Sequence, residues 1–363
     1  MKLVLYGATG HTGRLVAAAL QGVADTLVLA GRDRARLDAL AGSLEANVGV
    51  AVAPTYDETA LARAFEGAAV VVSCAGPFSQ MGEPVVRAAI ETGADYLDST
   101  GEQAFMREMY ERYESAARRR GVCVVNGHAF EIAIGDWAAA RAAERLGGDE
   151  PVDEIMVAYA LDHMRPTRGT QLSVAESLTR GGVVWDHDRW RAAAPASEAR
   201  TLSFPELGER STVSFPSGEV ITVPRHVEAR RVLTFISLGG GAAARLGASG
   251  ARLLGPALPA LVASPLASYL RSRVGARRTA PPDRSATRFA IAARARRGFE
   301  EAQVAVCGGD PYALTAGLLR AAAISLLARR PDRRPVGVLA PSQAFSPVEL
   351  QRTLTEHGCR IFE

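Results

Sequence analysis

The sequence predicts an α/β fold whose first part is a doubly wound parallel sheet. Three observations support this fold class: short aliphatic runs typical of strands buried on both faces, helical patterns between these runs, and a glycine-rich turn directly after the first run. The chain has 363 residues, and a single hydrophobic core usually stops growing near 250 to 300 residues. Two domains are therefore expected.

The predicted strands of the first domain follow one another within about the first third of the chain. They are KLVLY from residue 2, TLVLAGR from residue 26, AVVVSCAGPF from residue 69, GADYLDSTGE from residue 93 and GVCVVNG from residue 121. Helical segments such as EPVVRAAIETG separate the later runs. Strands that alternate with helices indicate a parallel sheet. Open parallel sheets bind ligands at the carboxyl ends of their strands, so the site is expected there.

Three glycines, Gly7, Gly10 and Gly13, lie between the first predicted strand and the first predicted helix. Glycine permits a positive φ, lets a diphosphate approach the backbone, and lets the helix pack close to the strand. The helix N-terminus then offers unpaired N–H groups to the phosphate. The spacing is GxxGxxG, not the more common GxGxxG, and a tight turn without a ligand is the alternative. We predict a dinucleotide site formed by Gly7, Thr9, Gly10, His11, Thr12 and Gly13.

The end of the second strand indicates which dinucleotide binds. An NAD site usually has an acidic residue there to hold the ribose 2′-hydroxyl, but this chain has Gly31 and Arg32. A guanidinium group suits a 2′-phosphate, which a carboxylate would repel. The predicted cofactor is therefore NADP(H), with Arg32 as the main contact and Arg36 as a helper, and a solvated surface arginine is the alternative. The end of the third run adds Cys74, Ala75, Gly76 and Pro77 to the predicted cofactor site.

Candidate catalytic residues are expected at the same strand ends, because hydride transfer needs a nearby group that delivers a proton. Tyr96 and Asp98 share one face of a strand by period-two alternation. His128 follows the last strand, and an imidazole has a near-neutral pKa; Glu131 comes soon after it. Structural hydrogen bonding is the alternative for Tyr96, Asp98 and His128. Predicted substrate contacts are Phe78, Ser99, Glu102, Arg168 and Arg225. The two arginines would bind a substrate carboxylate, and a surface position or an ion pair between elements is the alternative for them.

Composition argues against several classes of protein. The 42 basic and 39 acidic residues form no long block of one sign, which argues against a nucleic-acid partner. Lys2 is the single lysine, so a Walker A lysine, a Schiff-base lysine and a Tyr-x-x-x-Lys pair are all impossible. The four cysteines are far apart and no histidine cluster accompanies them, so no metal is predicted. No signal peptide is visible, and we expect a cytoplasmic protein with reduced thiols.

Two later segments have unusual composition. Residues 253–270 are apolar but contain three prolines, which predicts a kinked helix over the core and no integral membrane span; contact with a lipid surface is the alternative. Residues 271–288 are rich in arginine, glycine and proline and are expected to be an exposed connector, with a docking patch for an acidic carrier protein as the alternative.

The second domain is expected to mix helices and strands. DEIMVAYAL predicts a strand, TQLSVAESLTRGG predicts an amphipathic helix with a glycine C-cap, and residues 212–226 predict a β-hairpin around Pro216 to Glu219. Residues 286–298 and 301–309 predict a second antiparallel pair.

Taken together, the motifs resemble those of the saccharopine dehydrogenase-like oxidoreductases, including the branch called trans-acting enoyl reductases. The similar segments are GATGHTGRLVA, AGR, CAGPF, GEPVV and YLDSTGE in the first domain, RGTQLSVAESL and VITVPRHV in the middle, and GGDPYALTAGLLRAAA and GVLAPSQAF near the end. One segment departs from the family pattern: HAFEIAIGDWAA stands where GFDSxPxDLG is expected, with Glu131 near the usual aspartate position.

The resemblance implies three parts of the chain. An NADP(H)-binding Rossmann domain would occupy residues 1–130, and an inserted mixed α+β domain for substrate binding and dimerisation would occupy residues 131–307. Residues 308–363 would return to pack on the Rossmann domain.

The resulting functional prediction is an NADPH-dependent reductase that transfers a hydride to an activated C=C or C=N bond of a small or carrier-linked metabolite. The alternatives are a non-catalytic NADP(H)-sensing regulator and a lipid-surface-associated protein. A homodimer, formed through strands of the second domain, is left open.

Overall fold

The computed structural model describes residues 1–44, 48–148, 150–237, 239–240, 247, 250, 287–329 and 335–363. These residues form two compact units. Unit 1 contains Met1–Thr100, Phe105–Phe130 and Tyr312–His357, and unit 2 contains Gly101–Ala104, Glu131–Pro311 and Gly358–Glu363. The kinked helix predicted at residues 253–270 lies outside the described residues, as does nearly all of the connector at 271–288.

Unit 1 is built on a parallel sheet of seven described strands, with the order β15-β6-β5-β4-β1-β2-β3. The strands are β1 (Lys2–Tyr6), β2 (Thr26–Gly31), β3 (Val48–Val52), β4 (Ala68–Ser73), β5 (Asp95–Asp98), β6 (Cys123–Val125) and β15 (Gly337–Leu339). The predicted doubly wound parallel sheet is therefore confirmed. The strand order reverses between β1 and β4, so the loops that follow these two strands flank the point where such sheets bind ligands.

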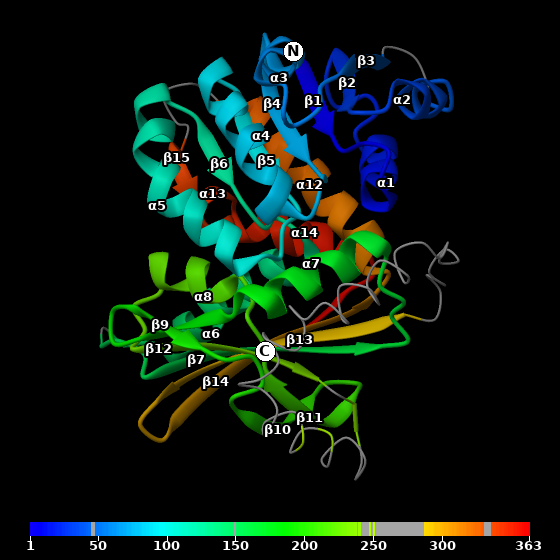
Figure 1. Ribbon diagram of the computed structural model, residues 1–363. Helices are drawn as coiled ribbons and strands as arrows, with labels where there is room; N and C mark the ends of the chain where they lie inside the picture. The colour runs from blue at the N-terminus through cyan, green and yellow to red at the C-terminus, as the bar shows by residue number, and fades with distance from the viewer. Residues whose placement is uncertain are drawn as a thin grey trace. The chain divides into compact units, whose positions relative to one another are not determined.

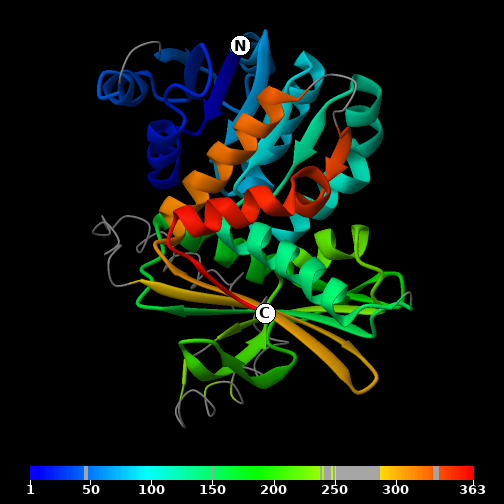
Figure 2. The same cartoon turned by 180° about the vertical axis from the view of Figure 1, so that it is seen from behind.

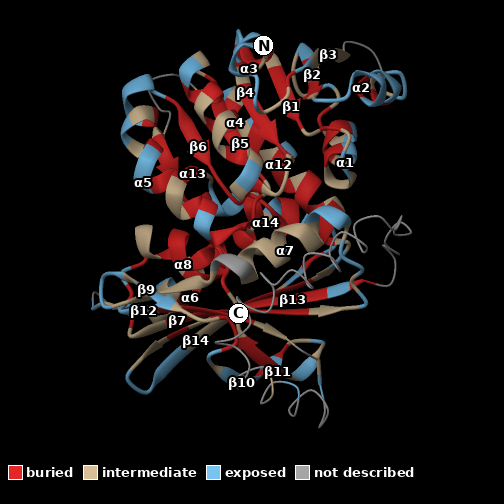
Figure 3. Cartoon of the chain, viewed as in Figure 1, coloured by how far each residue is buried: buried red, intermediate tan, exposed pale blue. Residues whose placement is uncertain are grey.

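Helices cover both faces of this sheet, with α4 and α5 toward the viewer in Figure 1 and α12 toward the viewer in Figure 2. The helices of unit 1 are α1 (His11–Ala19), α2 (Arg34–Ala41), α3 (Glu58–Phe65), α4 (Phe78–Thr92), α5 (Gln103–Arg120), α12 (Pro311–Ala328), α13 (Pro341–Ala344) and α14 (Pro347–Glu356), of which α5 and α12 begin in residues of unit 2. At one edge of the sheet β3 is only partly buried, but β1, β4, β5 and β6 are almost entirely buried, as Figure 3 shows. This burial explains why the strands are aliphatic without alternation.

The helix α12 is the one helix among the described residues that is long and apolar enough to cross a membrane, and 56% of that stretch is buried inside the protein. Leu319 and Ala323 of α12 are fully buried in a core cluster that also holds Leu3 and Leu5 of β1. A helix that packs on a sheet in this way has an apolar composition for that reason alone.

Unit 2 is built on a mixed sheet with the order β10-β11-β12-β7-β13-β14-β16, and β8 pairs with both β12 and β9. The strands are β7 (Glu154–Asp162), β8 (Gly182–Asp186), β9 (Trp190–Ala193), β10 (Ala199–Phe204), β11 (Gly208–Ser214), β12 (Arg231–Ser237), β13 (Arg288–Arg297), β14 (Glu300–Gly309) and β16 (Arg360–Phe362). The helices are α6 (Phe130–Leu146), α7 (Arg168–Arg180), α8 (Glu219–Thr222) and the 3₁₀ turn η1 (Val223–Arg225). The predicted mixed α+β domain is confirmed, and so is the antiparallel pairing of β13 with β14.

The hairpin predicted at residues 212–226 is wrong. The strand β11 ends at Ser214, and α8 and η1 take the place of the second strand. All four residues of α8, Glu219 to Thr222, are buried. A strand on the edge of a half-buried sheet would alternate between buried and exposed side chains, so the complete burial of this run overrides its β-branched composition.

Candidate functional site

The glycine turn after β1 lies against the loop after β4. Gly7 has a φ of +77°, and its N–H donates to the carbonyl oxygen of Ala30 at 2.9 Å. A Cβ on Gly7 would lie 2.7 Å from the backbone nitrogen of Ala75. Both the dihedral angle and the close approach therefore require glycine at this position.

The other two positions of the turn, Gly10 and Gly13, favour glycine for different reasons. A Cβ on Gly13 would overlap the carbonyl oxygens of Gly7 and Ala8, so Gly13 lets α1 pack against the turn. A Cβ on Gly10 would meet, among the described residues, only the carbonyl oxygen of Gly7 at 3.5 Å. Gly10 is the N-cap of α1, its φ is −70°, and no side chain caps this helix end. The space beside Gly10 therefore fits a group that approaches the backbone closely, such as a diphosphate.

One arginine contacts the same turn, and a second lies near the residue that precedes it. Arg36 donates from Nη2 to the carbonyl oxygen of Thr9 at 3.2 Å, which ties α2 to the glycine turn. Arg32 is exposed at the carboxyl end of β2. It lies close enough to Tyr6 to lower the pKa of the phenol, although burial outweighs this effect and raises that pKa to about 12. The acidic neighbour Asp33 accepts from the N–H of Arg36 at 3.1 Å and so serves as the N-cap of α2.

The loop after β4 begins with Cys74, whose N–H donates to the carbonyl oxygen of Tyr6 at 2.9 Å. Burial raises the pKa of the Cys74 thiol to about 12, against a smaller opposing effect of a hydrogen bond with Ser99, so the thiol stays neutral. Ala75, Gly76 and Pro77 lead into α4, of which Pro77 is the N-cap. Phe78 is 4% exposed, and its ring packs on the ring of Phe105 with centroids 5.7 Å apart.

Asp98 organises the carboxyl ends of β5 and β6. Its Oδ1 accepts from the N–H groups of Thr100 at 3.0 Å and Gly127 at 2.8 Å, and its Oδ2 accepts from Nδ2 of Asn126 at 2.7 Å. Burial raises the pKa of Asp98 to about 6, and the hydrogen bonds from Gly127, Thr100 and Asn126 limit the rise. The carboxylate thus holds two loops together at the edge where a ligand is expected.

Tyr96, Ser99 and His128 lie at the same edge of unit 1. Tyr96 is fully buried, and burial raises the pKa of its hydroxyl well above the usual value, with a smaller contribution from Asp98. The Ser99 N–H donates to the carbonyl oxygen of Ser73 at 3.3 Å. The His128 N–H donates to the carbonyl oxygen of Asp98 at 2.8 Å. The imidazole of His128 is almost fully buried, and its ring centroid lies 4.7 Å from that of Phe345.

The remaining sequence-predicted site residues belong to unit 2. Glu102 is buried and accepts from Oγ of Ser173 at 2.7 Å. The Oε1 atom of Glu131 lies beside Gly101, where a Cβ would be 3.1 Å from it. Burial raises the pKa of Glu131 to about 7. Arg168 is exposed at the start of α7, and Arg225 ends η1.

A group of buried polar side chains near Glu131 was missed by the sequence interpretation. Glu219 is fully buried, its Oε1 accepts from the hydroxyl of Tyr159, and a Cβ on Gly135 would overlap this oxygen. The Tyr159 hydroxyl is also 3.1 Å from Oγ of Ser217. Burial raises the pKa of Glu219 well above the usual value, and the charges of Asp136 and Glu131 add to this rise. Burial therefore favours the protonated, uncharged form of Glu219 over its carboxylate.

A second missed pair lies beside this group. Nε2 of His226 is 2.8 Å from Oδ1 of Asp136, which is fully buried. Burial lowers the pKa of His226, but the Asp136 carboxylate outweighs burial and the net pKa is raised. The one sequence feature that could have indicated this buried polar group is Glu219, a single acidic residue in the otherwise apolar run EVITV. Within the described residues, no group of three or more His, Cys, Asp or Glu side chains could hold a metal ion.

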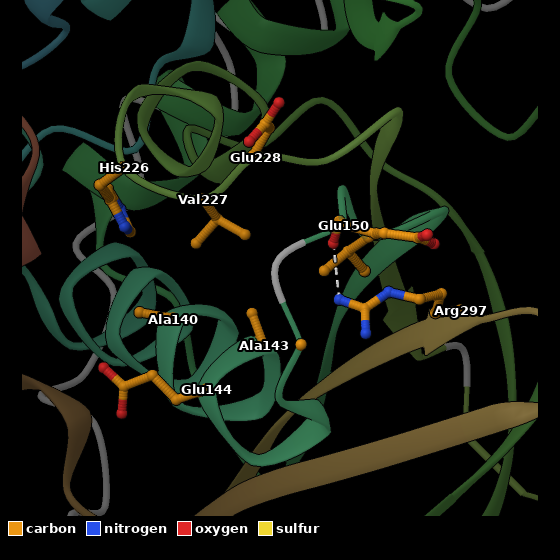
Figure 4. Close-up of a pocket in the computed structure, with 10 residues that line it drawn as sticks. Ala140, Ala143, Glu144, Glu150, His226, Val227, Glu228 and Arg297 are labelled. Atoms are coloured by element: carbon orange, nitrogen blue, oxygen red, sulfur yellow. Dashed lines mark hydrogen bonds between the residues drawn. The ribbon is translucent and has the colours of Figure 1, made fainter.

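Unit 2 also contains a cavity of about 240 Å³ (Figure 4). His226 and Val227 line one side, Ala140 and Ala143 of α6 lie opposite, and Arg297 donates from Nη2 to the carbonyl oxygen of Glu150 at 2.6 Å. Its other lining residues are Glu144, Gly148, Val152 and Glu228. Apart from Arg297 and the His226 ring, the polar side chains that line this cavity are carboxylates.

Comparison with known proteins adds a family match for the first third of the chain. Residues 3–125 match the family described as saccharopine dehydrogenase NADP binding domain. A lipid droplet localized protein of Caenorhabditis elegans is 31% identical over 158 residues, 40% of this chain and 37% of that protein. A putative trans-acting enoyl reductase of Mycobacterium tuberculosis is 34% identical over 159 residues, 42% of this chain and 38% of that protein. The matches thus cover less than two fifths of the length of these curated relatives.

A solved structure is similar over the whole chain. Apo saccharopine dehydrogenase (L-Glu forming) from Saccharomyces cerevisiae superimposes with a TM-score of 0.63 at 14% identity, with all of both chains covered. At this identity the similarity shows a shared fold.

Proposed function

Because residues 3–125 belong to the saccharopine dehydrogenase NADP-binding domain family, with NADP(H) as cofactor, we propose that the chain is an NADPH-dependent reductase. It would transfer a hydride to an activated C=C or C=N bond of a small or carrier-linked metabolite. The observation that carries this proposal is the glycine turn, where the protein leaves space beside the backbone of Gly10 and Arg36 contacts the loop, with Arg32 near Tyr6 directly before it.

The cofactor would be held by residues of unit 1. The N–H groups at the start of α1 and the backbone of Gly10 suit the diphosphate, and Arg32 suits the 2′-phosphate as a bidentate partner. Arg36 would position the turn through its bond to the carbonyl of Thr9. Bound NADPH supplies a hydride from its nicotinamide ring.

Glu131 is the proposed proton donor for the reduced substrate. Its pKa of about 7 suits a group that gives up a proton near neutral pH. It directly follows Phe130, whose N–H donates to Oγ1 of Thr315 at 3.2 Å within unit 1. The hydride and the proton from Glu131 would together saturate the double bond, leaving NADP⁺ and a carboxylate that solvent reprotonates.

The other proposed site residues would act around this step. Asp98 would position the loops through its three hydrogen bonds. Tyr96 and His128 would serve as further proton donors at the carboxyl ends of the strands of unit 1. We propose Phe78, Ser99, Glu102, Arg168 and Arg225 as substrate contacts.

The test is transfer of deuterium from the hydride position of labelled NADPH into a metabolite extract. The acceptor does not have to be guessed, because mass spectrometry finds the metabolite that gains the label. We expect deuterium to appear in one discrete product with the natural protein, and we expect no labelled product with the Arg32→Asp protein. Stoichiometric NADPH binding with no labelled product would instead favour a non-catalytic NADP(H)-sensing regulator.

A second candidate function is association with a lipid surface, because a relative that is 31% identical is named a lipid droplet localized protein. Flotation with neutral-lipid emulsions would test it: the reductase proposal alone predicts that the protein stays in the aqueous fraction. We also propose a cytoplasmic location and a homodimer, the latter to be tested by sedimentation equilibrium.

A further inference from the structure

The ring of Tyr312 contacts the glycine turn. Tyr312 is in the first turn of α12 and is 7% exposed. Its ring meets the ring of His11 edge to face, with centroids 5.0 Å apart and an interplanar angle of 80°. His11 is the first residue of α1, directly after Gly10. A residue near the end of the chain therefore touches the loop that would hold the diphosphate.

Further contacts join the same C-terminal segment, Tyr312–His357, to residues that follow β6. Oγ1 of Thr315 accepts from the N–H of Phe130 at 3.2 Å. The ring of Phe345 packs on His128 with centroids 4.7 Å apart. The matched NADP-binding family covers residues 3–125, so none of these C-terminal residues belongs to it.

We propose that Tyr312 is a cofactor-positioning residue, which holds the His11 ring and with it the first turn of α1 in the arrangement that receives the diphosphate of NADP(H). The NADP(H) site of this chain then extends beyond the N-terminal domain to α12. The inference requires cofactor binding only and does not depend on the hydride acceptor.

The physical reason is the rigidity of the turn. The glycines at positions 7, 10 and 13 have no side chains to restrain the loop, so its conformation depends on its neighbours. An edge-to-face aromatic pair contributes a directional contact beyond simple burial. Without the Tyr312 ring, His11 would have more rotamers available, and binding would have to order the turn at the expense of affinity.

The experiment measures the NADPH dissociation constant by calorimetry for the full chain and its variants. Tyr312→Phe keeps the ring and should stay within about twofold of the natural protein. Tyr312→Ala should weaken binding by about two- to tenfold, the range of a lost aromatic pair. In the His11→Ala background, Tyr312→Ala should have no further effect, because the two rings act through one contact.

Tyr113→Ala is the matched control, because it removes a tyrosine of unit 1 that is 9% exposed and whose hydroxyl donates to Glu83. It should lower thermal stability and leave NADPH affinity within about twofold. If Tyr312→Ala does not fold, Tyr312→Leu keeps apolar volume without a ring and is expected to show the same loss. The proposal would be overturned if Tyr312→Ala bound NADPH as tightly as the natural protein, or if Tyr312→Phe lost as much affinity as Tyr312→Ala. It would also be overturned if the losses from Tyr312→Ala and His11→Ala were additive, or if the control Tyr113→Ala lost a similar amount of affinity.

Discussion

Arg32 sets the expected preference for NADP(H) over NAD(H). It is exposed at the end of β2, and its acidic neighbour Asp33 is engaged as the N-cap of α2. Arg32→Asp should weaken NADPH binding by about tenfold or more, because a charge-assisted bond to the 2′-phosphate is replaced by repulsion. NADH binding should change far less. The control Arg34→Asp makes the same charge change at a residue paired with Asp38, and equal weakening of both nucleotides by Arg32→Asp would contradict the assignment.

Glu219 should make the stability of the protein depend on pH. Its pKa in the folded protein is raised from 4.5, so folding takes up a proton. The stability it contributes is complete below about pH 4.5 and is lost as the pH rises toward the folded value. Glu219→Gln is neutral at every pH. The free energy of unfolding of the natural protein, compared with that of this variant, should fall by up to about 1.4 kcal/mol per pH unit.

Urea unfolding at intervals from pH 5 to pH 9 measures this difference. The control Glu228→Gln changes an exposed carboxyl and should follow the natural protein throughout. Parallel curves for the natural protein and Glu219→Gln would show that Glu219 is ionised in the folded state.

Glu131 should give the reaction its own pH dependence. A proton donor works in its protonated form, and the pKa of Glu131 is about 7, so the rate of reduction should fall as the pH rises above 7. Glu131→Gln should be slower by about 10²- to 10⁴-fold, with that limb of the profile absent. The rate of NADPH oxidation in a single turnover, measured with the acceptor that the deuterium experiment identifies, checks both expectations. A Glu131→Gln variant with a natural rate and pH profile would remove Glu131 from the chemistry.

Local and distant residues differed in how far the sequence could predict them. The glycine turn and Arg32 follow from one strand–turn–helix segment, since their roles depend on neighbours within a few residues. Glu219 meets Tyr159 from β7 and Gly135 from α6, and no local pattern joins these three positions. Tyr312 and His11 are likewise brought together only by the fold.

At the level of elements, the parallel strands were predictable because short aliphatic runs are typical of strands buried on both faces of a sheet. The segment of α8 was not, because its β-branched residues are buried on all sides and pack as a short helix. The antiparallel pair β13 and β14 was predictable from two long β-rich runs joined by a short turn at Gly298.

The turn before α1 offers a prediction that separates folding from binding. In Gly10→Ala the new methyl group meets only the Gly7 carbonyl at 3.5 Å among the described residues, so the melting temperature should change by only a few degrees. Its NADPH affinity should fall by about tenfold or more, because the methyl fills the space for the diphosphate. Gly13→Ala should instead cost about 1–3 kcal/mol of stability, because its methyl overlaps the turn. Calorimetry and thermal unfolding of the Gly10→Ala and Gly13→Ala proteins test this. Full NADPH affinity in Gly10→Ala would contradict a diphosphate site beside Gly10.

At the level of the whole molecule, the chain passes between the two units five times, after Thr100, Ala104, Phe130, Pro311 and His357. A fragment of residues 1–130 would therefore lack α12, whose Leu319 and Ala323 complete the core of unit 1. We expect this fragment to lack cooperative unfolding and NADPH binding, whereas the full chain should be stabilised by about 2.7 kcal/mol when NADPH is at 100 times its dissociation constant. Circular dichroism and calorimetry check both, and natural affinity in the fragment would contradict the expectation.

The position of β15 beside β6 has a consequence for biosynthesis. The first strands of unit 1 leave the ribosome early, but their edge partner at Gly337–Leu339 is translated after the whole of the intervening unit. At bacterial or eukaryotic elongation rates this delay is on the order of tens of seconds. Throughout it the nascent sheet has an open edge and a bare apolar face, so the growing polypeptide should depend on chaperones until its last helices emerge.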